Sequence, residues 1–240
     1  MSQDSPLVVR SAADMLLSGG SRRGFLRTMA AGGSVLLLPS LFACSDDDDP
    51  LAPGGDGVVL DLSTDIGILN YAYALEQLEA AFYVEVVNRF TQSGITTAAE
   101  RAIFTDLRNH EVIHRELFKA ALGTARVGDL AVDFGNAFAS RQSVIQTAIA
   151  FEDLGVSAYN GAGKYLKRGE NLLLAGKIVS VEARHAAVVR DLLDTTGLAF
   201  ANNADAMGLD LVNEPAAVLG AADPFVTTPI SIGRAPTATT

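Results

Sequence analysis

The chain has a single cysteine, Cys44, among its 240 residues. Without a second cysteine no intramolecular disulfide can form, and the lack of thiolate ligands argues against a copper(I) site or an iron–sulfur cluster. Basic residues are also scarce, with 18 lysines and arginines against 28 acidic residues, which gives a formal net charge of −10. Nucleic-acid binding requires clustered basic side chains, so we expect no nucleic-acid partner.

Long apolar runs and alternating strand patterns are missing as well. The apolar stretch 29–42 is interrupted by Gly32, Gly33 and Pro39, and it is shorter than the roughly 20 apolar residues that a membrane-spanning helix needs. From residue 61 onward no convincing period-2 run appears, whereas helical periodicity appears four times. These features predict an all-α protein.

Residues 1–44 read as a twin-arginine export signal. Arg22 and Arg23 precede the apolar stretch, as the export machinery of that route requires. The stretch ends in Leu-Phe-Ala-Cys, which resembles a bacterial lipobox, where Cys44 would be lipidated; the bulky Phe42 leaves ordinary cleavage as the alternative. Residues 45–60 are acidic and rich in proline and glycine, which predicts a solvated linker. We therefore expect an exported lipoprotein, periplasmic or at the cell surface, held at the membrane through Cys44.

The remaining chain predicts a four-helix bundle over residues 61–200. Its amphipathic helices are expected near residues 64–90, 97–122, 138–161 and 171–196, and Thr97 with Glu100 forms a capping box at the start of the second. The connection over residues 123–137 is long, which favours a crossover between the second and third helices. Several prolines in residues 201–240 predict an irregular C-terminal arm.

Two copies of Glu-x-x-His lie within the apolar stripes of the second and fourth helices. They are Glu111 with His114 and Glu182 with His185. A spacing of three residues places both side chains of each pair on one helix face, where they can present an oxygen and a nitrogen to one metal ion. Glu76 and Glu152 lie in the stripes of the other two helices, about thirty residues before each pair. This order of acidic and imidazole groups is the ligand set of di-iron and di-manganese bundles.

Four buried carboxylates would repel one another and would each cost several kcal/mol unless cations compensated them. Two metal ions would provide this compensation, and oxygen with imidazole ligands suits iron or manganese, although zinc would also bind. Glu79 shares a stripe with Glu76 and is the alternative or additional ligand. Tyr83 and Tyr159 each follow a stripe glutamate by seven residues, so they are either core aromatics or hydrogen-bond partners of the ligand carboxylates. His110 points about 100° away from Glu111, which predicts a surface or helix-packing residue.

Four segments stand out: LEQLEAAFY (75–83), HEVIH (110–114), FEDLGVSAY (151–159) and VEARH (181–185). Together they resemble the ferritin-like superfamily, and more narrowly the exported ferritin-like proteins that include desiccation-associated proteins. The resemblance implies a ferritin-like bundle with a dinuclear metal centre and no particular reaction. It covers residues 61–226, including a tail with Glu-Pro at 214–215 and Pro-Phe-Val at 224–226.

Two functions of different kinds fit these residues. The first is a redox protein, with oxidase, peroxidase or catalase-like activity, whose two metals react with dioxygen or peroxide. The second is a non-catalytic envelope or stress-protection protein in which the metals hold the helices together. Iron storage is a weaker third hypothesis, because a lipid tether on each subunit is awkward in a closed cage. Whether the chain forms a homo-oligomer is left open by the sequence.

Overall fold

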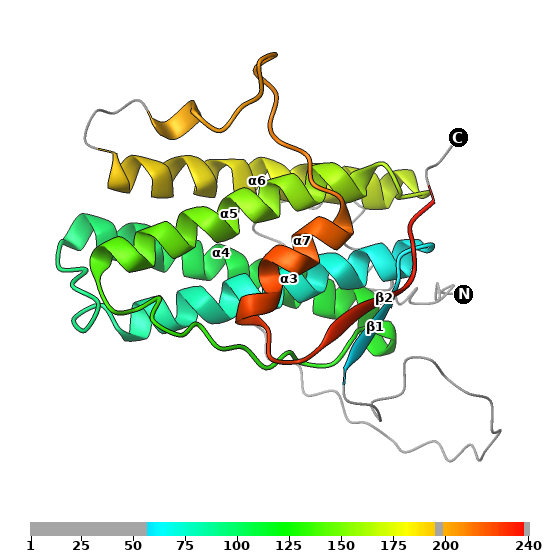
Figure 1. Cartoon of the computed structure of the whole chain (residues 1–240), viewed down its shortest axis with the longest axis horizontal. Coiled ribbons are helices and arrows are strands. Elements are labelled where there is room, and N and C mark those ends of the chain that lie inside the picture. Colours follow the sequence, from blue (N-terminus) through cyan, green and yellow to red (C-terminus); the bar gives the residue numbers. More distant parts are fainter. Residues whose placement is uncertain (1–56, 195–198, 238–240) are drawn as a thin grey trace, which may run out of the picture. The chain divides into compact units, whose positions relative to one another are not determined.

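The structure, a computed structural model, describes residues 57–194 and 199–237. Four long helices form a bundle in this part of the chain (Figure 1), which confirms the predicted all-α class. Each helix begins and ends within a few residues of its predicted range. None of the described helices has the length and apolar character that crossing a bilayer requires. The four helices are α3 (Asp65–Asn88), α4 (Ala98–Leu122), α5 (Arg141–Gly163) and α6 (Gly169–Leu193).

Side-chain caps define where three of these helices begin. The hydroxyl of Thr64 accepts from the backbone N–H of Gly67, and Ser140 caps α5 in the same way. At α4 Thr97 accepts from the backbone N–H of Glu100, as the predicted capping box requires. The Glu100 carboxylate, however, forms an ion pair with Arg141 at the start of α5, 2.5 Å away, so the glutamate joins two helices. Each cap satisfies a backbone donor that the first helical turn leaves unpaired.

The bundle consists of two helix pairs, α3 with α4 and α5 with α6. The crossover between them occupies residues 123–140 and includes the short 3-10 helix η1 (Gly123–Ala125). Two buried amides of α3 hold this crossover in place. Asn70 donates to the carbonyl of Ala125 at 2.8 Å and accepts from the N–H of Val127 at 2.8 Å. Gln77 makes the equivalent pair of bonds with the backbone at residues 128 and 130.

The segments on either side of the bundle are more regular than the sequence predicts. Val58–Asp61 form strand β1, and Ile230–Arg234 form strand β2, which pairs with β1 in parallel. The last residues of the predicted 45–60 linker are therefore part of a small sheet (Figure 1). The prediction of an irregular arm over residues 201–240 is wrong. This segment contains helix α7 (Pro215–Ala222), the 3-10 helix η3 (Asp223–Phe225) and strand β2. A further 3-10 helix, η2 (Ala199–Ala201), follows the gap after α6.

The C-terminal arm packs on the bundle through specific contacts. Phe225 places its ring 4.9 Å from that of Phe151 on α5, edge to face. Phe151 in turn contacts Phe82 on α3, at 5.1 Å and also edge to face. Aromatic pairs of this geometry add stabilisation beyond their buried area. The arm thereby covers the junction of α3 and α5 and contributes to the core around the buried site.

Candidate metal centre

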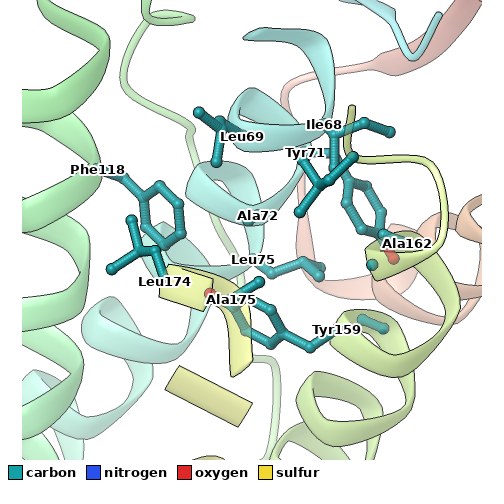
Figure 2. A pocket seen from close by; sticks show the side chains of 13 residues that line it. Ile68, Leu69, Tyr71, Ala72, Leu75, Phe118, Tyr159, Ala162, Leu174 and Ala175 are labelled. Atoms are coloured by element: carbon teal, nitrogen blue, oxygen red, sulfur yellow. The ribbon is translucent and has the colours of Figure 1, made fainter. Parts of the chain in front are cut away.

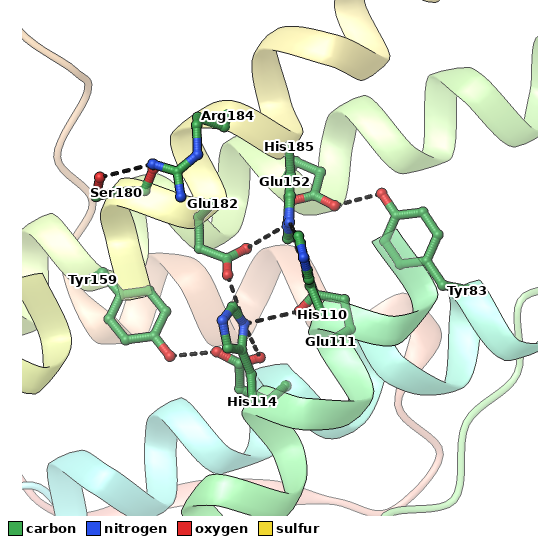
Figure 3. A network of polar contacts seen from close by, with 11 residues as sticks. Tyr83, His110, Glu111, His114, Glu152, Tyr159, Ser180, Glu182, Arg184 and His185 are labelled. Atoms are coloured by element: carbon green, nitrogen blue, oxygen red, sulfur yellow. Dashed lines mark hydrogen bonds and ion pairs between the residues drawn. The ribbon is translucent and has the colours of Figure 1, made fainter. Parts of the chain in front are cut away.

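All six predicted ligand residues are buried together in the interior of the bundle, and Figure 3 labels five of them: Glu111, His114, Glu152, Glu182 and His185. The four glutamates are fully buried, and His114 and His185 are 8% and 4% exposed. Their ligand atoms form two groups in which all atoms lie within 4.8 Å of one another. The first group consists of Glu76, Glu111, His114 and Glu182; the second consists of Glu111, Glu152, Glu182 and His185.

Each imidazole presents its Nδ1 atom to the carboxylates of its group. Nδ1 of His114 lies 3.0 Å from Glu182 Oε1 and 3.3 Å from Glu76 Oε2. Nδ1 of His185 lies 2.8 Å from Glu111 Oε1 and 3.4 Å from Glu152 Oε2. None of these contacts meets the criteria of a hydrogen bond, and each ring nitrogen lies near oxygens of more than one carboxylate. This is an arrangement in which a nitrogen and several oxygens can share one cation.

Tyr83 and Tyr159 hold two of the carboxylates from the opposite helix pair. The Tyr83 hydroxyl on α3 donates to Oε1 of Glu152 on α5, at 2.5 Å. The Tyr159 hydroxyl on α5 donates to Oε1 of Glu76 on α3. Burial first, and then the adjacent carboxylates, raise the pKa of both phenols well above the usual value, so both remain protonated donors. The sequence left open whether these tyrosines are core aromatics or hydrogen-bond partners of the carboxylates. In the structure both phenols contact the cluster.

The metal-free cluster has strongly displaced pKa values. Burial raises the pKa of Glu76 and of Glu152 to about 8, against the lowering effect of the nearest imidazole. Burial would also raise the pKa of Glu111, but the imidazoles of His114 and His185 lower it to about 2. For the histidines, burial alone would lower the pKa, yet the surrounding carboxylates raise it, to about 12 for His185. Protonated imidazoles therefore supply the positive charge that the metal-free carboxylates need.

The donor set and its unsatisfied atoms fit a pair of metal ions. Within the described residues, the carboxylate oxygens that face the centre of the cluster and both Nδ1 atoms are buried without a hydrogen-bond partner. Such groups are rarely left unpaired in folded proteins, because each costs about 1 to 3 kcal/mol. Two divalent cations would satisfy them and would balance four carboxylates. These atoms are Glu76 Oε2, both oxygens of Glu111 and Glu182, Glu152 Oε2, and Nδ1 of His114 and His185.

Glu79, the alternative ligand, lies beside the cluster but outside both groups. It is 3% exposed, and burial, followed by the charges of the cluster carboxylates, raises its pKa well above the usual value. Gly155 on α5 leaves the space for this carboxylate. A Cβ atom at Gly155 would lie 2.9 Å from Oε1 of Glu79 and 3.6 Å from Oε2 of Glu182. Of the two stripe glutamates on α3, Glu76 is therefore the one grouped with the other ligand atoms.

His110 makes a contact that the sequence did not reveal. Its side chain is exposed, as expected, but its Nδ1 lies 2.8 Å from Nε2 of His185 on α6. The helical position of His110 shows only that it points away from Glu111. It does not show that the neighbouring helix α6 brings His185 within reach on that side.

A small apolar cavity adjoins the cluster (Figure 2). Its volume is about 20 Å³, and its lining comes from all four long helices, including Leu75 and Phe118. The ring of Tyr159 is part of this lining, while its hydroxyl bonds to Glu76. Tyr71 also lines the cavity, and among the described residues its buried hydroxyl has no partner. One tyrosine thus joins an apolar cavity to the carboxylates.

Three further predicted residues, Arg22, Arg23 and Cys44, lie outside the described residues. Comparison with curated proteins found no match. A family model described as a ferritin-like domain matches residues 64–195, which is more than half of the chain and includes all six cluster residues. Together with the bundle and its buried acidic and imidazole groups, which could hold metal ions, this match shows that the chain belongs to the ferritin-like domain family.

Proposed function

We propose that this protein binds two metal ions, iron or manganese, between its four long helices. The observation that carries the proposal is the convergence of six buried ligand residues whose inward atoms have no hydrogen-bond partner in the described structure. Glu111 and Glu182 belong to both groups, so they would bridge the two ions. Glu76 with His114, and Glu152 with His185, would complete the two subsites.

The chemistry of the donors supports iron or manganese. Carboxylate oxygens with one imidazole nitrogen per ion form a hard to borderline ligand set, which suits these metals, whereas zinc usually has a tetrahedral site with fewer carboxylates. The six residues include no thiolate. Elemental analysis of protein purified from its own host tests the proposal. About two iron or manganese ions per chain would support it, and zinc alone or no metal would contradict it.

We further propose that the centre reacts with dioxygen or peroxide. When bound, the two ions would supply redox chemistry and Lewis acidity. The chain supplies the environment: burial of the four glutamates excludes bulk water, and the phenols of Tyr83 and Tyr159 hold two carboxylates in orientation. The cavity beside Tyr159 is apolar and accommodates about one water-sized molecule, which fits dioxygen.

A turnover assay separates this redox function from a purely structural one. Iron-loaded and manganese-loaded protein would be mixed with dioxygen or with hydrogen peroxide. The consumption of the oxidant by the native chain would then be compared with that by the Glu111→Ala variant. Turnover by the native chain that is lost in the variant supports the redox function. If neither metal form turns over, while a chelator lowers the melting temperature, the metals act by stabilising the fold.

Export and lipid anchoring are a separate part of the proposal, and the sequence supports them through Arg22, Arg23 and the Cys44 segment. The protein would leave the cytoplasm by the twin-arginine route and remain at a membrane surface through a lipid on Cys44. Mass spectrometry of the mature protein from its host tests this. A diacylglycerol-modified cysteine at the N-terminus is expected, and an unmodified soluble product with Cys44 intact would contradict it.

A further inference from the structure

The side chains of His110 and His185 form a hydrogen bond that joins the protein surface to the buried cluster. Nδ1 of His110 lies 2.8 Å from Nε2 of His185 (Figure 3). The ring planes differ by 17° and the centroids are 5.1 Å apart, the separation expected when two rings share a hydrogen bond edge to edge in nearly one plane. His110 is exposed, whereas His185 is 4% exposed. The contact is therefore in line and lies at the outer edge of the cluster.

The ligand role of His185 determines the direction of this hydrogen bond. Its Nδ1 atom faces the carboxylates of Glu111, Glu152 and Glu182. If Nδ1 gives its lone pair to a metal ion, the ring proton must be on Nε2, since a neutral imidazole has one protonated nitrogen and one nitrogen with a free lone pair. Nε2 of His185 then donates to Nδ1 of His110. Metal-binding histidines usually donate this second N–H to a carboxylate, a carbonyl or water, and the bond fixes both tautomer and ring orientation.

The rest of the cluster is nearly symmetric, and His110 breaks the symmetry. Glu76 with Tyr83 on α3 corresponds to Glu152 with Tyr159 on α5, and the phenols bond crosswise. Glu111 with His114 on α4 likewise corresponds to Glu182 with His185 on α6. The residue before the glutamate is His110 on α4, but it is Val181 on α6. An isopropyl side chain cannot accept a hydrogen bond, so the position equivalent to His110 offers His114 none.

We propose that His110 is a positioning residue that holds the His185 ring with Nδ1 toward the metals and so makes the two metal subsites unequal. The subsite of Glu152 and His185 binds its ion more tightly than it would without His110. The subsite of Glu76 and His114 lacks this support. The inference rests on the proposed dinuclear centre, and it adds that the two ions differ in affinity because of one exposed residue.

Stepwise binding of Co²⁺ to metal-free protein tests this inference, with stoichiometry from elemental analysis and subsite geometry from the visible bands of Co²⁺. His110→Val gives α4 the residue found at the equivalent position of α6. We expect one of the two equivalents to bind about 10- to 100-fold more weakly, with changed visible bands, while the other is unaffected. His110→Gln can still accept from Nε2 of His185 and is expected to restore most of the affinity. Asn109→Ala, an exposed neighbour on the same helix, is the control and should leave both equivalents unchanged.

Each outcome decides between positioning and packing. If His110→Val binds both equivalents as tightly as the native chain, the inference is wrong while the dinuclear centre stands. If His110→Gln is as weak as His110→Val, the hydrogen-bond acceptor is not what matters, and the inference is again wrong. Failure of the native chain to bind two equivalents rejects the proposed function itself. Circular dichroism of each metal-free variant verifies that the helices are intact before the titrations are compared.

Discussion

The hydroxyl of Tyr83 on α3 lies 2.5 Å from Oε1 of Glu152 on α5. Tyr159 on α5 reciprocates with Glu76 on α3. In each helix the glutamate and the tyrosine are seven residues apart, nearly two turns, and therefore share a face. The two helices consequently exchange a pair of buried hydrogen bonds, one on each side of the cluster (Figure 3). These bonds orient the carboxylates and also join the two halves of the bundle.

Tyr83→Phe should lower the free energy of unfolding by about 1 to 3 kcal/mol, since the substitution keeps the ring and removes a buried donor from a carboxyl group. Chemical denaturation of the metal-free protein measures this. Tyr165→Phe is the matched control, because the hydroxyl of Tyr165 donates to Glu214 at 2.6 Å in a solvent-exposed hydrogen bond. Loss of this hydrogen bond should lower the free energy of unfolding much less. Equal costs for the two variants would contradict a role of Tyr83 in fixing the cluster.

The positions of the cluster residues could be predicted because the period of a helix fixes which residues share a face. Glu76, Glu111, Glu152 and Glu182 stand inside apolar stripes, and a carboxylate there implies a compensating charge whatever the packing in detail. The helix ends were also predictable from local signals such as Thr97. Four amphipathic helices, each with an acidic residue in its apolar stripe, were sufficient to predict a four-helix bundle around a metal centre.

The small sheet and the contact of His110 with His185, which sequence reasoning missed, depend on contacts between distant segments. β1 and β2 are only four and five residues long, so neither has a pattern long enough to recognise, and they come from opposite ends of the described part of the chain. The contact of His110 with His185 depends on the rotation and separation of α4 and α6. A helical wheel of α4 alone contains neither quantity.

The bridging and terminal glutamates should differ in their effect on metal content. Glu182 belongs to both ligand groups, whereas Glu76 belongs to one. Glu182→Ala should therefore reduce the content of bound metal toward zero, while Glu76→Ala should retain about one ion per chain. Elemental analysis after loading with excess Mn²⁺ and desalting provides the measurement. Equal retention by both variants would show that Glu182 does not bridge.

Metal binding should release protons and become tighter as pH rises. In the metal-free protein the pKa of Glu76 and of Glu152 is raised to about 8, and that of His185 to about 12. The pKa of His114 is raised as well. All four groups are therefore protonated near neutral pH and must lose their protons to become ligands, so about four protons leave per loaded chain. Calorimetric titration in buffers of different ionisation enthalpy counts them, and an affinity that does not change between about pH 6 and pH 8 would contradict the prediction.

The metal-free protein should lose stability as pH rises. The metal-loaded protein should not, because metal binding becomes tighter over the same range. Burial raises the pKa of Glu76 and Glu152 from 4.5 to about 8. A carboxyl group with a raised folded-state pKa contributes stability that is complete below its unfolded value and is lost as pH rises through the folded value. Glu111 has the opposite shift, but its contribution is lost only below about pH 4.5. Melting temperatures with and without chelator should thus diverge between about pH 5 and pH 8, and parallel curves would contradict this.

Gly161 determines how closely the C-terminal arm approaches α5. A Cβ atom there would lie 1.8 Å from the backbone oxygen of Asn213, which cannot move aside as a side chain could. Asn213 is held in place because its backbone N–H donates to the carbonyl of Ser157 at 3.1 Å and its amide donates to the Ser157 hydroxyl at 2.9 Å. Gly161→Ala should therefore displace the arm.

The expected cost of Gly161→Ala is about 1 to 3 kcal/mol of unfolding free energy, in spite of the better helix propensity of alanine. Gly176→Ala on α6 is the matched control, since a Cβ atom there meets no other atom within 4 Å. That variant should gain about 0.5 to 1 kcal/mol. Limited proteolysis distinguishes a displaced arm from a weakened bundle, because a displaced arm would be cut faster between residues 199 and 214 while the four long helices stay protected. Equal stability changes in the two variants would show that the arm does not depend on the close approach at Gly161.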